Sequence, residues 1–453
     1  MVHGPERSTW LRSDRFLARS VAQPVNRFLH IEASGGVLLA VAAVVALVWA
    51  NSPWSAAYHD LWGTLLTVDL GGHAITEDLR HWINDGLMTL FFFVIGLEIK
   101  HEMSQGQLTS FRQAVVPAAG ALGGMVVPAA LYLALNTGGD GAAGWGVPMA
   151  TDVAFALGVL ALLGSRVPGE LKVLLLSLAI VDDVGAIVVI AAFYSDGIDA
   201  RWLAGAAAGL VAVALLRRAR VRYIPVYVVV GAVTWLATFS SGVHATIAGV
   251  ALGLLAPARA FLPEVDAERI ASTLSLDQHV TASEVRDISF RLRESVPVTE
   301  RLQSLLHPWT SYLVVPLFAL ANAGVTVSAD ALGDAAGSAV TVGVVLGLIV
   351  GKLVGVAGAV ALVVRLGIGR LPASVTTRHL VGMSGLAGIG FTVSLFVTGL
   401  AFDDPAITDQ AKIGVLVASV GAAVVGSAIL LGTRPGGTEG SAADEHRIGD
   451  SIA

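Results

Sequence analysis

Apolar runs about as long as a membrane helix recur along almost the whole of this 453-residue chain. Hydrophobic residues make up 55% of it and charged residues only 14%, whereas a soluble domain carries about 25% charged residues. Because about 20 apolar residues in a helix span a bilayer, the sequence predicts an all-α polytopic membrane protein. The chain has no cysteine, which excludes disulfides, iron–sulfur clusters and thiolate metal sites.

About twelve membrane spans are predicted, with boundaries good to a few residues. The first is expected to remain as a signal anchor, because the residues before it are polar and Arg-rich and lack a cleavage pattern. The predicted spans are 31–50, 84–103, 114–135, 146–164, 171–194, 202–217, 223–239, 242–256, 308–325, 339–363, 380–402 and 410–432.

The distribution of basic residues tests this number of spans. If the N-terminus and every second connection face one side, that side holds all but four of the 28 Lys and Arg residues. Arg80, Arg201 and Lys412 lie on the opposite side, and Lys352 lies inside a span. Such asymmetry follows the positive-inside rule and places both termini in the cytoplasm.

Four regions lie outside the predicted spans, which together form a twelve-span domain at 31–432. A cytoplasmic N-terminal segment covers 1–30, and a Gly-, Ser- and acid-rich cytoplasmic tail at 433–453 is predicted to be disordered. A polar cytoplasmic connection of mixed charge covers 257–306. Between the first two spans, two strand-like runs flank Gly71-Gly72, which predicts an extracytoplasmic β-hairpin with a two-residue turn.

Two adjacent aspartates, Asp182 and Asp183, fall near the middle of the span at 171–194. A charge at that depth costs roughly 2.5–3.5 kcal/mol on insertion scales, and two neighbouring charges also repel. Residues that cost so much at a bilayer midplane are functional candidates.

Two spans carry signs of a break. Asp152 follows Pro148 and Thr151 in a short span, and Gly385, Gly388 and Gly390 interrupt another. Broken helices are tolerated only where their free backbone groups face protein or a water-filled cavity. Each break falls in the second member of a triplet of spans, at 114–194 and at 339–432. Corresponding breaks in two halves indicate the central site of a transporter built from inverted repeats.

Lys352 lies about twelve residues from either end of its span, or ~18 Å from the interface at a ~1.5 Å rise per residue. It is too deep to reach water comfortably, so it requires a carboxylate partner, and the aspartate pair can supply one. Because consecutive helical side chains point about 100° apart, one aspartate can hold the lysine while the other faces a cavity.

Structural explanations compete for each of these residues. A single intramembrane Asp–Lys pair can be purely structural, but three aspartates and a lysine beside two broken helices favour a functional site. His244 is as compatible with a structural role as with a pH response. Glu98 could pair with Lys100 or His101, or it could line a cytoplasmic access funnel.

Carboxylates, hydroxyls and backbone carbonyls are oxygen donors, which suit hard cations such as Na⁺ or Li⁺. A carboxylate that takes either a proton or a cation makes the two compete for one site. If only the loaded states cross the membrane, that competition is exchange.

At these residues the chain resembles the NhaA-type sodium/proton antiporter family, from about Ile31 to Leu431. The resemblance rests on long motifs in order along the chain. They include Trp82-Ile-Asn-Asp-Gly-Leu-Met88, Val94-Ile-Gly-Leu-Glu-Ile-Lys100, Leu178-Ala-Ile-Val-Asp-Asp-Val-Gly-Ala-Ile187, Ser241-Gly-Val-His-Ala-Thr-Ile-Ala-Gly249 and Gly388-Ile-Gly-Phe-Thr-Val-Ser394, with further matches at 150–164, 307–309 and 316–324. The general rule that paired broken helices mark a central site was established in part on this family, so the rule and the resemblance are not independent.

The resemblance implies an electrogenic antiporter of the bacterial inner membrane that expels Na⁺ or Li⁺ in exchange for protons and serves pH and sodium homeostasis. It has no cofactor, is not an enzyme and binds no nucleic acid. The resemblance assigns cation and proton binding to Asp183, with Asp182 also essential and paired with Lys352. The roles that it implies for other residues are charge compensation at the helix breaks by Asp152 and Lys352, cation-site lining by Thr151, and cation access and pH response by Glu98 and His244.

The hairpin near Gly71-Gly72 matches the family's dimerisation element, which implies a homodimer. The chain departs from the family at Gln303-Ser304, where a Glu-His pair is frequent, and its 257–306 connection is longer than usual. Two rival functions are an intramembrane aspartyl protease and a passive cation channel. The protease requires a carboxylate dyad from two helices, typically with a Gly-x-Gly-Asp signature that the chain lacks.

Overall fold

The computed structural model of the protein describes residues 34–433, except 71–72, 107–109, 196, 222 and 261–281. The predicted segment 1–30, nearly all of the predicted tail, the turn glycines Gly71-Gly72 and part of the 257–306 connection lie outside the described residues. The remaining chain is almost entirely helical, as predicted.

The helices and strands of the first part of the chain run from α2 to α11. They are α2 (Ser34–Ala50), α3 (Ser55–Trp62), β1 (Leu65–Leu70), β2 (His73–Asp78), α4 (Leu79–His81), η3 (Trp82–Leu87), α5 (Met88–Gln105), α6 (Phe111–Leu135), η5 (Asp140–Met149), α7 (Val153–Leu162), η6 (Gly164–Arg166), α8 (Gly169–Phe193), α9 (Ala200–Arg218), α10 (Ile224–Ser240) and α11 (Thr246–Leu255).

The second part runs from α13 to α21. It comprises α13 (Ala282–Glu294), α14 (Val298–Trp309), η7 (Thr310–Val314), α15 (Val315–Asn322), α16 (Ala329–Gly337), α17 (Ala339–Leu346), η8 (Gly347–Gly351), α18 (Lys352–Arg365), α19 (Thr377–Leu386), α20 (Phe391–Ala401) and α21 (Pro405–Leu431).

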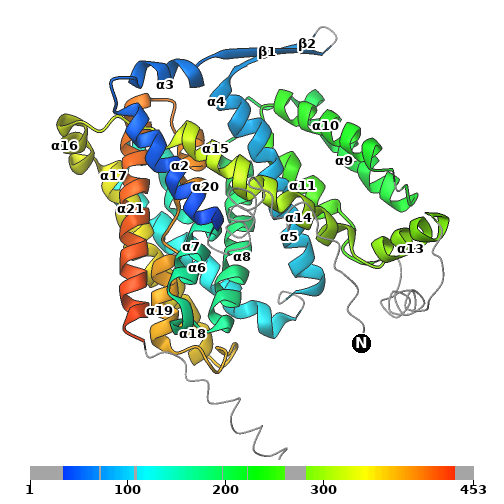
Figure 1. The fold of residues 1–453 in the computed structure, drawn as a ribbon. Coiled ribbons are helices and arrows are strands. Elements are labelled where there is room, and N and C mark those ends of the chain that lie inside the picture. Colours follow the sequence, from blue (N-terminus) through cyan, green and yellow to red (C-terminus); the bar gives the residue numbers. More distant parts are fainter. Residues whose placement is uncertain are drawn as a thin grey trace, which may run out of the picture.

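Among the described residues, seven helices are long and apolar enough to cross a membrane, or up to ten if each of three bent helix pairs counts as one span. More of α8 is buried inside the protein than of any other long span, and α9 is the most exposed. In Figure 1, α8 lies within the bundle, α9 and α10 form one flank, and α17 and α21 lie on the other. The predicted site on α8 is therefore at the centre of the protein.

A two-stranded antiparallel sheet projects from one end of the bundle, called the hairpin end below (Figure 1). Leu70 of β1 pairs with His73 of β2 and Thr67 pairs with Thr76, so the two strands are joined by two residues. The hydroxyls of Thr67 and Thr76 lie 2.9 Å apart across the strands. This register confirms the predicted hairpin.

Both predicted breaks are present. The 3₁₀ helix η5 and the helix α7 meet at an angle of 46°, and α19 and α20 meet at 44°. Pro148 lies inside η5, where it cannot donate a backbone hydrogen bond. The second break follows Leu386 and includes Gly388, where a Cβ would lie 2.2 Å from the carbonyl oxygen of Leu348. Only glycine permits that approach of two backbones.

Several helix ends differ from the sequence-based spans. The span predicted at 308–325 is the end of a continuous helix that begins at Val298, inside the predicted polar connection. Hydropathy detects the apolar portion of a helix, but the polar turns of α14 continue it beyond that portion. The short helix α3, which bends 116° from α2, was also not predicted because eight residues do not form a long apolar run.

Helices α6 and α18 cross in very close contact. A Cβ on Gly123 would lie 2.2 Å from the Gly355 carbonyl oxygen, and a Cβ on Gly355 would lie 2.2 Å from the Gly123 carbonyl oxygen. Small residues at such crossings let helix backbones approach within a membrane. Because Lys352 begins α18, this crossing also fixes the lysine relative to the rest of the site.

We expect Gly355→Ala to destabilise the protein by about 1–3 kcal/mol, because the new methyl group can only push backbone away. Gly358→Ala is the matched control, since Gly358 lies one turn further along α18 and a Cβ there meets nothing within 4 Å. Thermal unfolding in detergent measures both. If Gly355→Ala melts at or above the temperature of Gly358→Ala, the tight crossing is wrong.

Candidate functional site

The two helix breaks lie against each other and are joined by hydrogen bonds. The Thr151 hydroxyl donates to the carbonyl of Ala387 at 2.8 Å, and the Asp152 amide donates to the carbonyl of Ile389 at 2.6 Å. The free backbone groups of one break are therefore partly satisfied by the other. Thr151 and Asp152 are buried, with 1% and 3% of their surfaces exposed.

Asp152 lies at the start of two helices at once. Its Oδ1 accepts from the Phe155 amide of α7 at 2.9 Å, which is an N-cap. Its Oδ2 accepts from the amide of Thr392 in α20 at 3.1 Å and from the Thr392 hydroxyl at 2.6 Å. Helix N-termini carry a partial positive charge, so one carboxylate compensates two of them.

Lys352 and Asp182 form a fully buried ion pair. The lysine Nζ donates to Asp182 Oδ2 at 2.6 Å, and both side chains are 0% exposed. A carboxylate partner for Lys352 was expected from the sequence, and the geometry selects Asp182 for that contact. The second oxygen of Asp182, Oδ1, is buried without a hydrogen-bond partner among the described residues.

Asp183 differs from its neighbour. It is buried, with 7% of its surface exposed, and it has no hydrogen bond or ion pair with any residue that the structure describes. Asp182, Asp152 and Lys352 all lie close enough to act on it electrostatically. The carboxylate of Asp183 is therefore free to take a ligand in a site whose other charges are already paired or hydrogen-bonded.

Glu98 lies on α5 toward the end of the bundle opposite the hairpin. The side chain of Gln303 on α14 is the hydrogen-bonding group that acts on its carboxylate, and no ion pair joins Glu98 to Lys100 or His101 among the described residues. An open cavity of about 300 Å³ lies beside this contact and is lined by Glu300, Gln303, Ser304, His307 and Pro308.

His244 lies at the hairpin end, between α10 and α11. Its Nε2 contacts the backbone carbonyl of Tyr194, the C-cap residue directly after α8. The structure thus brings His244 to the end of the helix that carries the aspartate pair, while Asp152, Thr151 and Lys352 gather at its middle.

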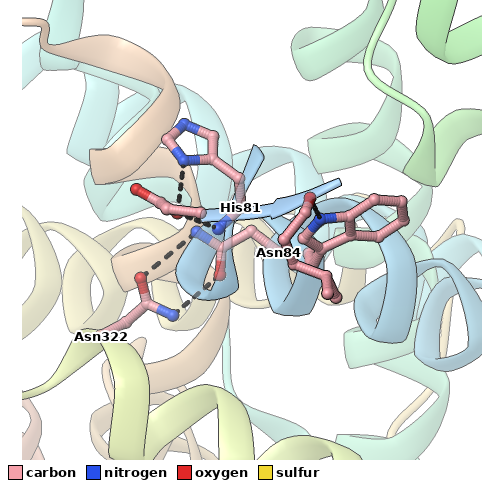
Figure 2. A network of polar contacts seen from close by, with 6 residues as sticks. His81, Asn84 and Asn322 are labelled. Atoms are coloured by element: carbon pink, nitrogen blue, oxygen red, sulfur yellow. Dashed lines mark hydrogen bonds and ion pairs between the residues drawn. The ribbon is translucent and has the colours of Figure 1, made fainter. Parts of the chain in front are cut away.

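A pair of asparagines joins two elements near the hairpin end. Figure 2 shows Asn84 of η3 and Asn322 of α15 exchanging hydrogen bonds, with Asn322 Nδ2 2.8 Å from Asn84 Oδ1. The same view shows His81 beside the carboxylate of Asp78, which caps the short helix α4. The asparagine pair holds η3, which leads into α5, against α15, and the Asp78 cap fixes the turn from β2 into α4.

Sequence reasoning missed Thr392 and Ser394 as parts of the crossing. Thr392 binds Asp152, and the Ser394 hydroxyl donates to the Val147 carbonyl of η5 at 2.7 Å. Two hydroxyl residues at the start of a helix, directly after Gly388 and Gly390, were the available signal. Among the described residues, no group of three or more His, Asp or Glu side chains is arranged to hold a metal ion.

Two broken helices that cross at buried charges define a secondary membrane transporter. The family described as Na⁺/H⁺ antiporter 1 matches residues 26–430. The chain is 46% identical to Na⁺/H⁺ antiporter NhaA 2 of Sorangium cellulosum over 93% of this chain and 92% of that protein. It is 49% identical to Na⁺/H⁺ antiporter NhaA of Rhodopirellula baltica over 91% and 94%. The chain belongs to the NhaA family of Na⁺/H⁺ antiporters.

Proposed function

We propose that the protein is an electrogenic antiporter that exchanges cytoplasmic Na⁺ or Li⁺ for a larger number of external protons, with Asp183 as the carboxylate that binds cation and proton alternately. One observation carries this assignment. Lys352 neutralises Asp182, which leaves Asp183 buried among charges and without a partner among the described residues. A carboxylate in that position can be neutralised only by a mobile cation or a proton.

The neighbouring residues have supporting roles in this proposal. Asp152 compensates the N-termini of α7 and α20, and Lys352 compensates Asp182. Thr151 lies at the crossing with its hydroxyl bonded to Ala387, so it can contribute a hard oxygen to the cation. The antiporters that the chain matches are transporters rather than enzymes, and the proposed mechanism uses only the transported ions and the residues of this chain.

The proposed topology has twelve spans in two inverted repeats. The twelve spans are supported by the seven long helices, by the three bent pairs and by the shorter apolar helices α10 and α11, each of which overlaps one predicted span. In each triplet of spans, α6 to α8 and α17 to α21, the middle span is the broken one. The positive-inside asymmetry supports cytoplasmic termini, and the match to bacterial Na⁺/H⁺ antiporters supports a location in the bacterial inner membrane.

The hairpin and the two peripheral charged sites complete the proposal. An exposed two-stranded sheet is suited to pairing with a second copy, which supports a homodimer. Glu98, beside the open cavity, would attract cations from the cytoplasm, and His244 would transmit pH to the end of α8. An aspartyl protease is not supported, because Asp182 pairs with a lysine instead of a second carboxylate.

The exchange is tested in everted membrane vesicles with an acidified interior. Adding Na⁺ or Li⁺ should collapse the pH gradient, and the apparent KM for Na⁺ should rise about tenfold per unit fall in pH once protons hold the site. Valinomycin and equal K⁺ on both sides clamp the membrane potential. Na⁺ that enters through a passive cation channel then creates no voltage to drive protons out, so it could not collapse the pH gradient. No response at any pH between about 6.5 and 9 would contradict the proposed function.

A further inference from the structure

Tyr194, the C-cap residue directly after the aspartate-bearing helix α8, binds the first broken helix with its side chain. The Tyr194 hydroxyl accepts a hydrogen bond from the Gly146 amide at 3.0 Å and donates one to the Ala143 carbonyl at 2.7 Å. In a 3₁₀ helix the amide of residue i bonds to the carbonyl of residue i−3. Gly146 and Ala143 are such a pair in η5, so the phenol bridges two groups of the helix backbone itself.

The surroundings of Tyr194 hold its ring in one orientation. The ring stacks on Trp145 of η5 with centroids 6.4 Å apart, and Phe193 meets Trp145 edge-on at 5.1 Å. Tyr194 itself is buried, with 7% of its surface exposed. A Cβ on Gly146 would lie 2.6 Å from the phenol oxygen, so a larger residue there would displace the hydroxyl.

The backbone of Tyr194 makes a third connection. Its carbonyl contacts Nε2 of His244, in the segment between α10 and α11. One residue therefore joins the end of α8, the hairpin-end half of a broken span, and a titratable side chain on a third element.

The position of Tyr194 couples the two sides of the transport site. η5 ends at Met149, directly before the break that holds Thr151 and Asp152, whereas α8 carries Asp183. Ligand groups contributed by two elements must keep their relative position to within about 0.5 Å to bind one small ion well. A clamp between the hairpin end of α8 and η5 sets that position.

We infer that Tyr194 is a positioning residue for cation binding, which holds the Thr151–Asp152 break in register with Asp183 through its hydroxyl. The inference rests on the proposed assignment of Asp183. It predicts an effect on cation affinity from a side chain that does not itself touch the cation.

Tyr194→Phe removes the hydroxyl and keeps the aromatic stack. Loss of a hydrogen bond of about 1 kcal/mol predicts a KM for Na⁺ raised about fivefold in proteoliposomes, with a smaller change in maximal rate. The matched control is Tyr132→Phe. Tyr132 is also buried, with 0% of its surface exposed, and its hydroxyl also binds η5, at the Gly141 carbonyl 2.6 Å away, but it comes from α6. The KM of Tyr132→Phe for Na⁺ should stay within about twofold of wild type.

Gly146→Ala provides an independent second variant, because it displaces the same hydroxyl while leaving Tyr194 intact. It should raise the KM in the same direction, and it decides the question if Tyr194→Phe does not accumulate as folded protein. A wild-type KM for Na⁺ in folded Tyr194→Phe, or an equal rise of that KM in Tyr132→Phe, would overturn the inference about Tyr194 but leave the proposed function standing. A wild-type protein without Na⁺-dependent proton movement would instead overturn the proposed function.

Discussion

Vesicles that contain Asp183→Asn are expected to show no Na⁺- or Li⁺-dependent collapse of the pH gradient. Asparagine has nearly the shape of aspartate but can neither carry a negative charge nor exchange a proton under physiological conditions. If Asp183 is the carboxylate shared by cation and proton, the loss should be complete at every pH. A reduced but saturable response would mean that another carboxylate performs the exchange.

The same variant should remain folded. Asp183 has no hydrogen bond or ion pair with the described residues, and its charge lies beside that of Asp182, so its removal relieves repulsion. We therefore expect a melting temperature equal to or above that of wild type. Asp199→Asn is a suitable control for transport, because Asp199 caps α9 at the hairpin end and asparagine is an equally good N-cap. This control should transport normally.

The broken helices and the buried ion pair could be predicted because each leaves a local mark in the sequence. Pro148 and the glycines at 385, 388 and 390 disfavour continuous helix, and a lysine placed as deep as Lys352 needs a carboxylate wherever the chain folds. The spans could be predicted from hydropathy because each is an apolar run within one segment of the sequence. All of these predictions depend on the free-energy cost of placing a residue in its own helix, and none requires knowledge of which helices pack together.

The choice of partner could not be predicted from the residues alone. Asp182 and Asp183 are neighbours on one helix, and only the packing of α18 and α8 against α6 decides which one Lys352 meets. The contact between Asp152 and Thr392 joins residues 240 positions apart, and it exists only because the two breaks cross. The contact of the Tyr194 hydroxyl with η5 could not be predicted either, because it joins two elements that meet only in the folded protein.

Stability should depend on the Lys352–Asp182 pair much more than on Asp183. Both partners are completely buried, and Lys352 is the partner that the structure provides for the Asp182 carboxylate. Lys352→Ala would leave an uncompensated buried charge, which costs about 3–5 kcal/mol. We expect a lower melting temperature in detergent together with loss of transport.

A double variant separates the lost pairing from the lost volume. Adding Asp182→Asn to Lys352→Ala removes the orphaned charge, so it should recover much of the lost stability without restoring transport. The two effects must be non-additive, because the residues are in direct contact. An unchanged melting temperature in Lys352→Ala, or additive losses in the double variant, would contradict the pairing. If the double variant is stable but does not transport, folding does not require the two buried charges. Ion exchange is then the reason that the chain keeps them.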